Sequence, residues 1–181
     1  MTDLVLTLIG PDRPGLVQAV AGIVAANGGN WLESRMTHLA GKFAGILRAE
    51  LPAARVADAL AALRALEGQG LKVVAETAAR APRPAPERTM DLELLGLDRP
   101  GIVREIAQLF AETGVNVEEL VTNTKSAPMS GETLFEARAH VHVPAGTDVA
   151  KLRAALERIE KDLMVEISLE DRSAGAQGRA R

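Results

Sequence analysis

The chain has 181 residues, a mass of 19.1 kDa, 47% hydrophobic and 25% charged residues, and no cysteine. These values exclude a disulfide-stabilised miniprotein and a disordered chain, and no apolar run reaches the roughly 18 to 20 residues of a membrane-spanning helix. The N-terminus reads as a strand and not as a signal peptide, so we expect a soluble, cytoplasmic protein.

The first 77 residues contain six predicted elements. Alternating apolar residues predict a strand at the start, and apolar residues at helical spacing predict the helix that follows. In chain order we expect a strand around Leu4–Leu8, a helix from Leu16 to Val24, strands over about 30–38 and 43–51, a helix over about 56–66 and a strand over 71–76. The predicted order is βαββαβ.

An internal repeat with an offset of 86 residues begins at the end of the first strand. Gly10-Pro11-Asp12-Arg13-Pro14-Gly15 recurs as Gly96-Leu97-Asp98-Arg99-Pro100-Gly101. Of the 25 positions from Gly10 to Ser34, 11 are identical to their counterparts, which indicates a duplication. The second copy also repeats the element order, ending in a helical stripe over 149–163 and a strand over 165–169.

A proline-rich segment separates the copies. Prolines remove backbone donors and hold a chain extended. We predict a first module over residues 1–77, a linker over 78–88, a second module over 89–172 and a frayed tail over 173–181. In each module, right-handed crossovers place both helices on one face of a four-stranded antiparallel sheet, which is the ferredoxin-like α+β fold.

The two copies differ in two places. The hairpin between the second and third strands is six residues longer in the second copy, with the addition close to 126–131. The sheet face away from the helices is predicted to be polar in the second copy and largely apolar in the first. An exposed apolar face usually marks a contact surface, so we expect this face to be covered by the other domain or by another chain, and we expect a homo-oligomer.

The repeated motif offers a place for a small zwitterion. Pro14 and its counterpart Pro100 are predicted at the first helical position, and the glycine that follows each presents backbone amides at the positive end of the helix dipole. Asp12 can receive an ammonium group, and Asn30 begins the neighbouring strand. The same turn can be purely structural, because Asp, Pro and Gly also cap helices and reverse chains.

The motif, the asparagine and the tandem βαββαβ order together resemble the ACT domain, a module that typically binds amino acids. The resemblance spans nearly the whole chain apart from the linker and tail. By this resemblance the ligand contacts are Asp12, Arg13, Gly15 and Asn30 in the first module and Asp98, Arg99, Gly101 and Asn116 in the second. The arginines fit equally well as solvated surface charges. The first module has Trp31 where the second has Val117, so the two sites need not bind the same ligand.

The hairpin sequence resembles a closer family. Two ACT-like modules without a catalytic domain, together with the segment from Thr122 to Phe135, resemble the glycine cleavage system transcriptional repressors. This resemblance implies a response to glycine and action through a DNA-binding activator partner, without direct contact to nucleic acid. The net charge of -3 and the four aromatic residues agree, because they give little attraction to phosphate backbones or bases.

Three other interpretations are weaker. An enzyme lacks support because the sequence contains no nucleophile elbow, phosphate loop or zinc-protease motif. His140 and His142 share one strand face, but no third metal ligand is evident, so we expect no metal and no cofactor. An RNA-recognition module needs outward aromatic residues on its central strands, whereas Phe43 and Phe135 fall in the inward phase.

We therefore predict a tandem ACT-type regulator that binds a small, glycine-like amino acid and controls a protein partner. The alternative is a structural adaptor of the same fold whose ligand sites are vestigial. If the motif glycine only makes room for a carboxylate, Gly101→Val is expected to weaken ligand binding with less effect on folding.

Overall fold

The computed structural model describes residues 1–78, 88–127 and 131–172. The chain divides into two compact units, Met1–Pro82 and Arg83–Arg181. The predicted linker is too long at both ends, because the Ala78 N–H donates to the Asp3 carbonyl (2.9 Å) and a strand begins at Arg88. The rest of the linker and the predicted tail over 173–181 lie outside the described residues.

The first unit has the predicted βαββαβ order. Its elements are β1 (Thr2–Pro11), α1 (Leu16–Ala26), β2 (Asn30–Leu39), β3 (Lys42–Leu51), α2 (Val56–Ala65) and β4 (Lys72–Thr77), with short 3₁₀ helices at Ala53–Arg55 and Leu66–Gln69. The strands form one antiparallel sheet in the order β2-β3-β1-β4. This order confirms the ferredoxin-like prediction.

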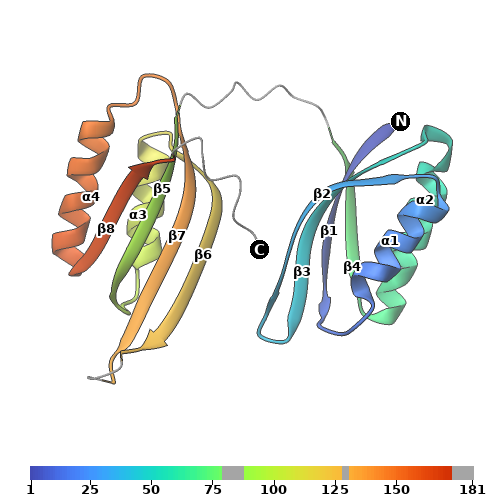
Figure 1. Cartoon of the computed structure of the whole chain (residues 1–181), viewed down its shortest axis with the longest axis horizontal. Helices are drawn as coiled ribbons and strands as arrows, with labels where there is room; N and C mark the ends of the chain where they lie inside the picture. Colours follow the sequence, from blue (N-terminus) through green and yellow to red (C-terminus); the bar gives the residue numbers. More distant parts are fainter. Residues whose placement is uncertain (79–87, 128–130, 173–181) are drawn as a thin grey trace. The chain divides into compact units, whose positions relative to one another are not determined.

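The second unit repeats the arrangement. Its elements are β5 (Arg88–Leu97), α3 (Ile102–Glu112), β6 (Asn116–Ser126), β7 (Thr133–Val143), α4 (Val149–Leu163) and β8 (Val165–Asp171). The strand order is β6-β7-β5-β8, which matches the first unit strand for strand. Figure 1 shows α1 and α2 on the same side of the first sheet.

Each core lies between the sheet and its helices. Leu4, Leu6 and Leu8 alternate along β1 and are at most 2% exposed, because successive strand residues point to opposite faces. In the second unit, Met90, Leu92 and Leu94 occupy the same phase of β5 and are also buried. Two separate core clusters result, one in each unit.

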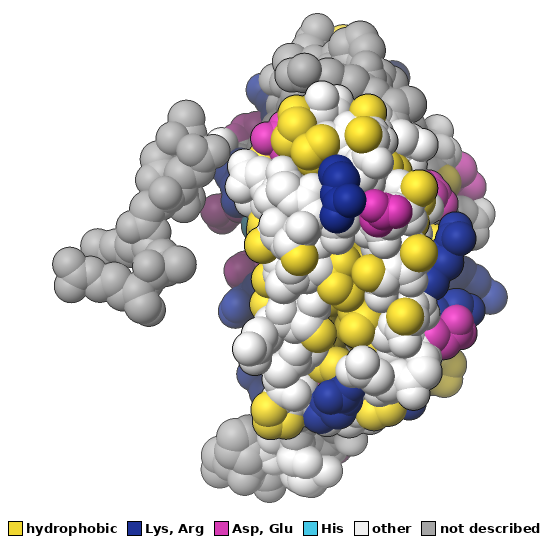
Figure 2. Space-filling view, turned by 90° about the vertical axis from the view of Figure 1, so that its right-hand side faces the viewer, with side chains coloured by type: hydrophobic (Ala, Val, Ile, Leu, Met, Phe, Trp, Pro, Cys, Tyr) yellow, Lys and Arg dark blue, Asp and Glu magenta, His cyan; other side chains and the backbone are white. Residues whose placement is uncertain are grey.

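The helix-covered side of the first unit carries few charges. Helix α1 has no charged residue, and α2 has only Asp58 and Arg64. Figure 2 shows this side, with hydrophobic side chains along its middle. In the described part of the chain, none of the helices combines the length and apolar character that crossing a membrane requires.

The extra residues of the second hairpin lie partly in its two strands and partly in the loop between them. In the first unit a two-residue turn, Ala40-Gly41, joins β2 to β3, and both of its residues have positive φ. In the second unit, β6 and β7 are each one residue longer than their counterparts and six residues join them. Of the predicted insertion, residues 128–130 lie outside the described part.

Helix α4 begins with a side-chain cap. The Asp148 carboxylate accepts hydrogen bonds from the backbone N–H groups of Ala150 and Lys151, both at 3.1 Å. The Lys151 N–H is the main cause that lowers the pKa of Asp148, and the Lys151 ammonium group adds to it. The folded state therefore holds the Asp148 proton less tightly than the unfolded state does.

We expect Asp148→Ala to lower the stability of the second unit at neutral pH. Because the folded pKa is lowered, the stabilisation by the Asp148 carboxylate is present at neutral pH and disappears as pH falls through that folded pKa. Urea unfolding of both proteins as a function of pH measures this, and the two curves should converge in acid. A difference that persists unchanged below the folded pKa would contradict the charged cap.

Candidate ligand-binding site

The repeated motif forms the turn between the first strand and first helix of each unit. Strand β1 ends at Pro11 and α1 begins at Leu16, while β5 ends at Leu97 and α3 begins at Ile102. The sequence predicted Pro14 and Pro100 at the first helical position, but each helix begins two residues later, at Leu16 and Ile102. A glycine stands between each proline and its helix, with φ of +90° at Gly15 and +101° at Gly101. This left-handed conformation favours glycine, so the motif glycine has a backbone role.

The helices that follow the motif begin without a side-chain cap. The carbonyl of Gly15 accepts the first helical bond from the Ala19 N–H (2.9 Å), and the carbonyl of Gly101 accepts from the Glu105 N–H (3.0 Å). Neither helix start has a side-chain hydrogen bond to its free amides, unlike α4. An anion at either start would meet unpaired N–H groups at the positive end of the helix dipole.

The first motif residue of the repeat, Gly10 or Gly96, has a packing role. A Cβ on Gly10 would lie 2.6 Å from the Gly70 carbonyl oxygen, and one on Gly96 would lie 2.4 Å from Cγ1 of Val165. No side chain fits at either position without movement of its neighbours. Two of the motif's repeated residues are therefore explained by the fold alone.

The charged motif residues lie at the surface in the first unit. Asp12 and Arg13 are exposed, the Asp12 N–H donates to the Gly41 carbonyl (2.9 Å), and the Arg13 guanidinium donates to the Gln69 carbonyl (3.0 Å). Both bonds tie the turn to neighbouring loops and leave the Asp12 carboxylate at the surface. Arg13 is thus partly engaged in holding the loop before β4.

The second unit differs at its arginine. The Asp98 N–H donates to the Thr133 carbonyl (2.8 Å), which anchors the turn to the start of β7. Asp98 is exposed, whereas Arg99 is half-buried. Gly101 is also half-buried, and Arg104 pairs with Glu105 (2.8 Å) within the first turn of α3. The two copies of the motif therefore present different surroundings to a ligand.

The asparagines lie at the other end of each sheet. Asn30 pairs with Glu50, whereas Pro11 at the end of β1 pairs with Lys42, so eight residues of β3 separate the two levels. At roughly 3.3 Å per residue this separation is about 26 Å. One amino acid cannot contact Asn30 and Asp12 of the same unit. The register of Asn116 with His142 gives the same result in the second unit.

A small apolar cavity beside the start of α3 was not predicted from the sequence. It has a volume of about 40 Å³ and lies between α3, β6 and β7, with Ile102, Val103, Val117, Leu120 and Phe135 among its lining residues. In the first unit Trp31, the counterpart of Val117, packs against the core. The replacement of Trp31 by Val117 is the sequence difference that could have indicated this cavity.

The two histidines do not form a metal site in the described residues, where no group of three or more metal-ligating side chains occurs. His140 instead contacts two carboxylates. Its Nδ1 lies against Asp91 Oδ1, and its Nε2 lies 3.6 Å from Glu119 Oε2. These contacts join β5, β7 and β6 on the outer face of the second sheet.

One family of domains matches both units. The ACT domain family matches residues 2–76 and residues 85–166. The chain therefore belongs to this family and carries two ACT domains in tandem, in agreement with the two observed sheets.

Among proteins of known role, the chain resembles a transcriptional repressor. The glycine cleavage system transcriptional repressor of Escherichia coli (strain K12) is 28% identical over 168 residues, which cover 92% of this chain and 88% of the repressor. A crystal structure of an unknown protein from Galdieria sulphuraria is 30% identical, with a TM-score of 0.82, and covers 95% of this chain and 99% of that one.

A second crystal structure, described as a candidate glycine cleavage system transcriptional repressor, shares the fold. It is 20% identical, with a TM-score of 0.70, and covers 95% of this chain and 98% of that one. The resemblance predicted from the tandem motif and hairpin is confirmed.

Proposed function

We propose that this protein is a non-enzymatic regulator that binds a small, glycine-like amino acid and thereby controls a protein partner in transcriptional regulation of the glycine cleavage system. The observation that carries the proposal is the pair of uncapped helix starts, each preceded by an exposed aspartate, in a tandem ACT protein. The relation to a transcriptional repressor supports a regulatory role.

The turn from Asp98 to Gly101 provides complementary groups for an amino acid. The ligand carboxylate would accept hydrogen bonds from the first free N–H groups of α3, where the helix dipole favours negative charge. Asp98 is exposed and can pair with the ligand ammonium group. Asp12, Arg13 and Gly15 give the first unit a corresponding site in different surroundings, with Arg13 held by Gln69.

The asparagines are proposed to act across a contact between two copies. Strand β6 is an edge strand, and its Leu120 and Val121 are 49% and 58% exposed. If the β6 strands of two copies pair antiparallel about Val121, the bulge between Val117 and Glu119 brings Asn116 of the second copy level with Lys125. Lys125 precedes Ser126, which pairs with Thr133 at the end of the sheet that anchors the Asp98 turn. Asn116 would then close the ligand site of the other copy, as Asn30 would in an equivalent pairing of β2.

Calorimetry and thermal shift with the twenty amino acids test the ligand. We expect glycine or a close relative to raise the melting temperature, because a ligand at about 100 times its Kd stabilises by roughly 2.7 kcal/mol. Asp98→Ala should weaken that binding at least tenfold. The matched control, Asp171→Ala, removes an exposed aspartate at the other end of the same sheet and should bind as wild type does.

The protein partner is tested by co-purification from the native host with and without glycine. A ligand changes partner binding only by its differential affinity for two states, so the amount of captured transcriptional activator should depend on glycine. No thermal response to any amino acid at millimolar concentration would overturn the sensor and favour an adaptor with vestigial sites.

A further inference from the structure

The outer face of the first sheet, on the side away from the helices, is apolar at its centre. Ile9, Ile46 and Val74 come from three adjacent strands and are 49%, 50% and 47% exposed. Ile46 and Val74 both lie opposite Thr7 in the strand register, so these side chains form one contiguous patch. Isolated surface hydrophobic residues are ordinary, whereas a patch across three strands indicates a contact.

The same face of the second unit shows that the fold does not require this patch. The counterparts of Ile46 and Val74 there are Arg138 and Ser168, both opposite Glu93. Arg138 and Glu93 are exposed and pair at 3.5 Å. A polar outer face is thus sufficient for an ACT sheet to fold, and the predicted difference between the two faces is confirmed.

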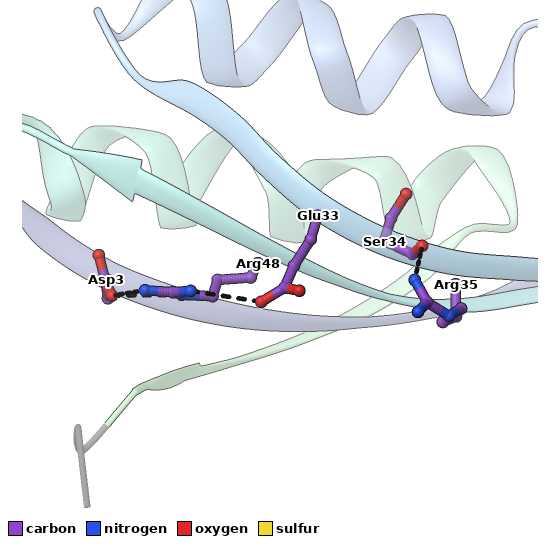
Figure 3. A network of polar contacts seen from close by, with 5 residues as sticks. All are labelled: Asp3, Glu33, Ser34, Arg35 and Arg48. Atoms are coloured by element: carbon purple, nitrogen blue, oxygen red, sulfur yellow. Dashed lines mark hydrogen bonds and ion pairs between the residues drawn. The ribbon is translucent and has the colours of Figure 1, made fainter. Parts of the chain in front are cut away.

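One end of the apolar patch is acidic. Arg48 donates to Asp3 (2.7 Å) and to Glu33 (3.3 Å), and Figure 3 shows these side chains in a row. The Asp3 hydrogen bond is the main cause that raises the pKa of Arg48, followed by the Glu33 hydrogen bond. Glu50 lies opposite Asp3, and Glu76 lies opposite Val5. This end therefore carries four carboxylates and one guanidinium group, and two of the carboxylates, Asp3 and Glu33, contact Arg48.

The other end of the patch is basic. Lys42 lies opposite Pro11 and Lys72 lies opposite Ile9, both in the outward phase of their strands. In the described part of the chain, neither lysine forms an ion pair with a carboxylate. Arg35 lies level with the centre, at the β2 edge, where it donates to the Ser34 carbonyl. The outer face is thus apolar in the middle and oppositely charged at its two ends.

We infer that this outer face binds the same face of a second copy of the chain, with the two sheets stacked and their strands antiparallel. A two-fold axis that crosses the strands at the level of Thr7 makes the charged ends complementary. It places Lys72 over Glu76 of the second copy and Lys42 over Glu50 of the second copy, and each contact occurs twice.

Sheet packing allows this arrangement. Stacked sheets lie about 10 Å apart and their strands cross at about 30°, so apolar side chains fill the middle while long charged side chains meet at the ends. Arg35 stays at the edge of the stack. The contact uses no residue from Asp12 to Gly15 or from Asp98 to Gly101, and its member nearest to a motif turn is Lys42, which pairs with Pro11.

Sedimentation velocity of the full, ligand-free chain tests the apolar centre. We expect wild type to associate as concentration rises, and the double variant Ile9→Glu with Ile46→Glu to associate at least tenfold more weakly over a 100-fold concentration range, since the proposed pairing of β6 strands is left intact. Leu95→Glu is the matched control, because Leu95 is the counterpart of Ile9 in the second unit and is 38% exposed. It should associate as wild type does. Unchanged association in the double variant, or a wild type that is monomeric throughout, overturns the inference.

A charge exchange within one strand tests the proposed axis and does not alter the core. Lys72→Glu should weaken association about tenfold, because like charges then meet at two symmetric places. Adding Glu76→Lys to this variant should restore it, since the exchanged charges again face each other across the axis. Equal weakening in both variants overturns the antiparallel arrangement.

Discussion

Replacing Gly10 by alanine is expected to lower the free energy of unfolding of the first unit by about 1–3 kcal/mol, the usual cost of an extra methyl group in a filled space. The new Cβ would lie 2.6 Å from the Gly70 carbonyl oxygen and 3.2 Å from the Leu71 Cα. Both atoms belong to the backbone, so relief requires movement of the chain before β4. Urea unfolding followed by hydrogen exchange assigns the change to the first unit.

Gly22→Ala is a matched control for this prediction. Gly22 lies within α1, and a Cβ there would have no neighbour within 4 Å. Alanine is the better helix former, so this variant should be more stable than wild type by about 0.5–1 kcal/mol. The same change from glycine to alanine is thus expected to lower the free energy of unfolding at position 10 and to raise it at position 22. If Gly10→Ala unfolds as wild type does, the close approach of β1 to Gly70 is wrong.

The fold could be predicted from the sequence because its signals are local and occur twice. Leu4, Leu6 and Leu8 alternate in a way that only a strand buries on one side, and the 86-residue repeat allows each weak element to be checked against its copy. The βαββαβ order with right-handed crossovers then leaves few topologies. The predicted boundary between linker and second module was less accurate. Arg88 has no strand pattern in the sequence around it, and it belongs to β5 because it pairs with Val143.

The site was predicted less completely because its geometry depends on register and backbone conformation. Pro14 reads as a helix start, but the left-handed Gly15 delays the helix to Leu16. From the sequence, Asn30 was expected to join the motif residues in one site. The pairing of β2 with β3 places it at the far end of the sheet. Neither fact has a local sequence signal. The small cavity lies beside Val117, where the first unit has the larger Trp31. Whether neighbouring side chains fill the space that valine leaves depends on the packing of the folded chain.

Replacing Gly101 by valine is expected to impair both folding and ligand binding. The sequence alone predicts a smaller effect on folding, but a φ of +101° is a conformation that β-branched residues avoid. The variant should therefore lose about 1–3 kcal/mol of stability from backbone strain. Space is not the cause, since a Cβ would meet only the Arg104 guanidinium, at 3.9 Å. Valine would also stand beside the free amides of α3, where the proposed ligand carboxylate binds.

Strain and loss of the ligand site can be separated with a second left-handed glycine. Gly146 has a φ of +81°, lies before α4, and has no atom within 4 Å of an added Cβ. Gly146→Val should lose a similar amount of stability and still bind glycine as wild type does, because β7 carries this loop to the opposite end of the sheet from Asp98. Calorimetry at a temperature where both variants are folded should show at least tenfold weaker binding only for Gly101→Val. Equal affinities in the two variants would mean that the start of α3 does not hold the ligand, even if Gly101 remains essential to the turn.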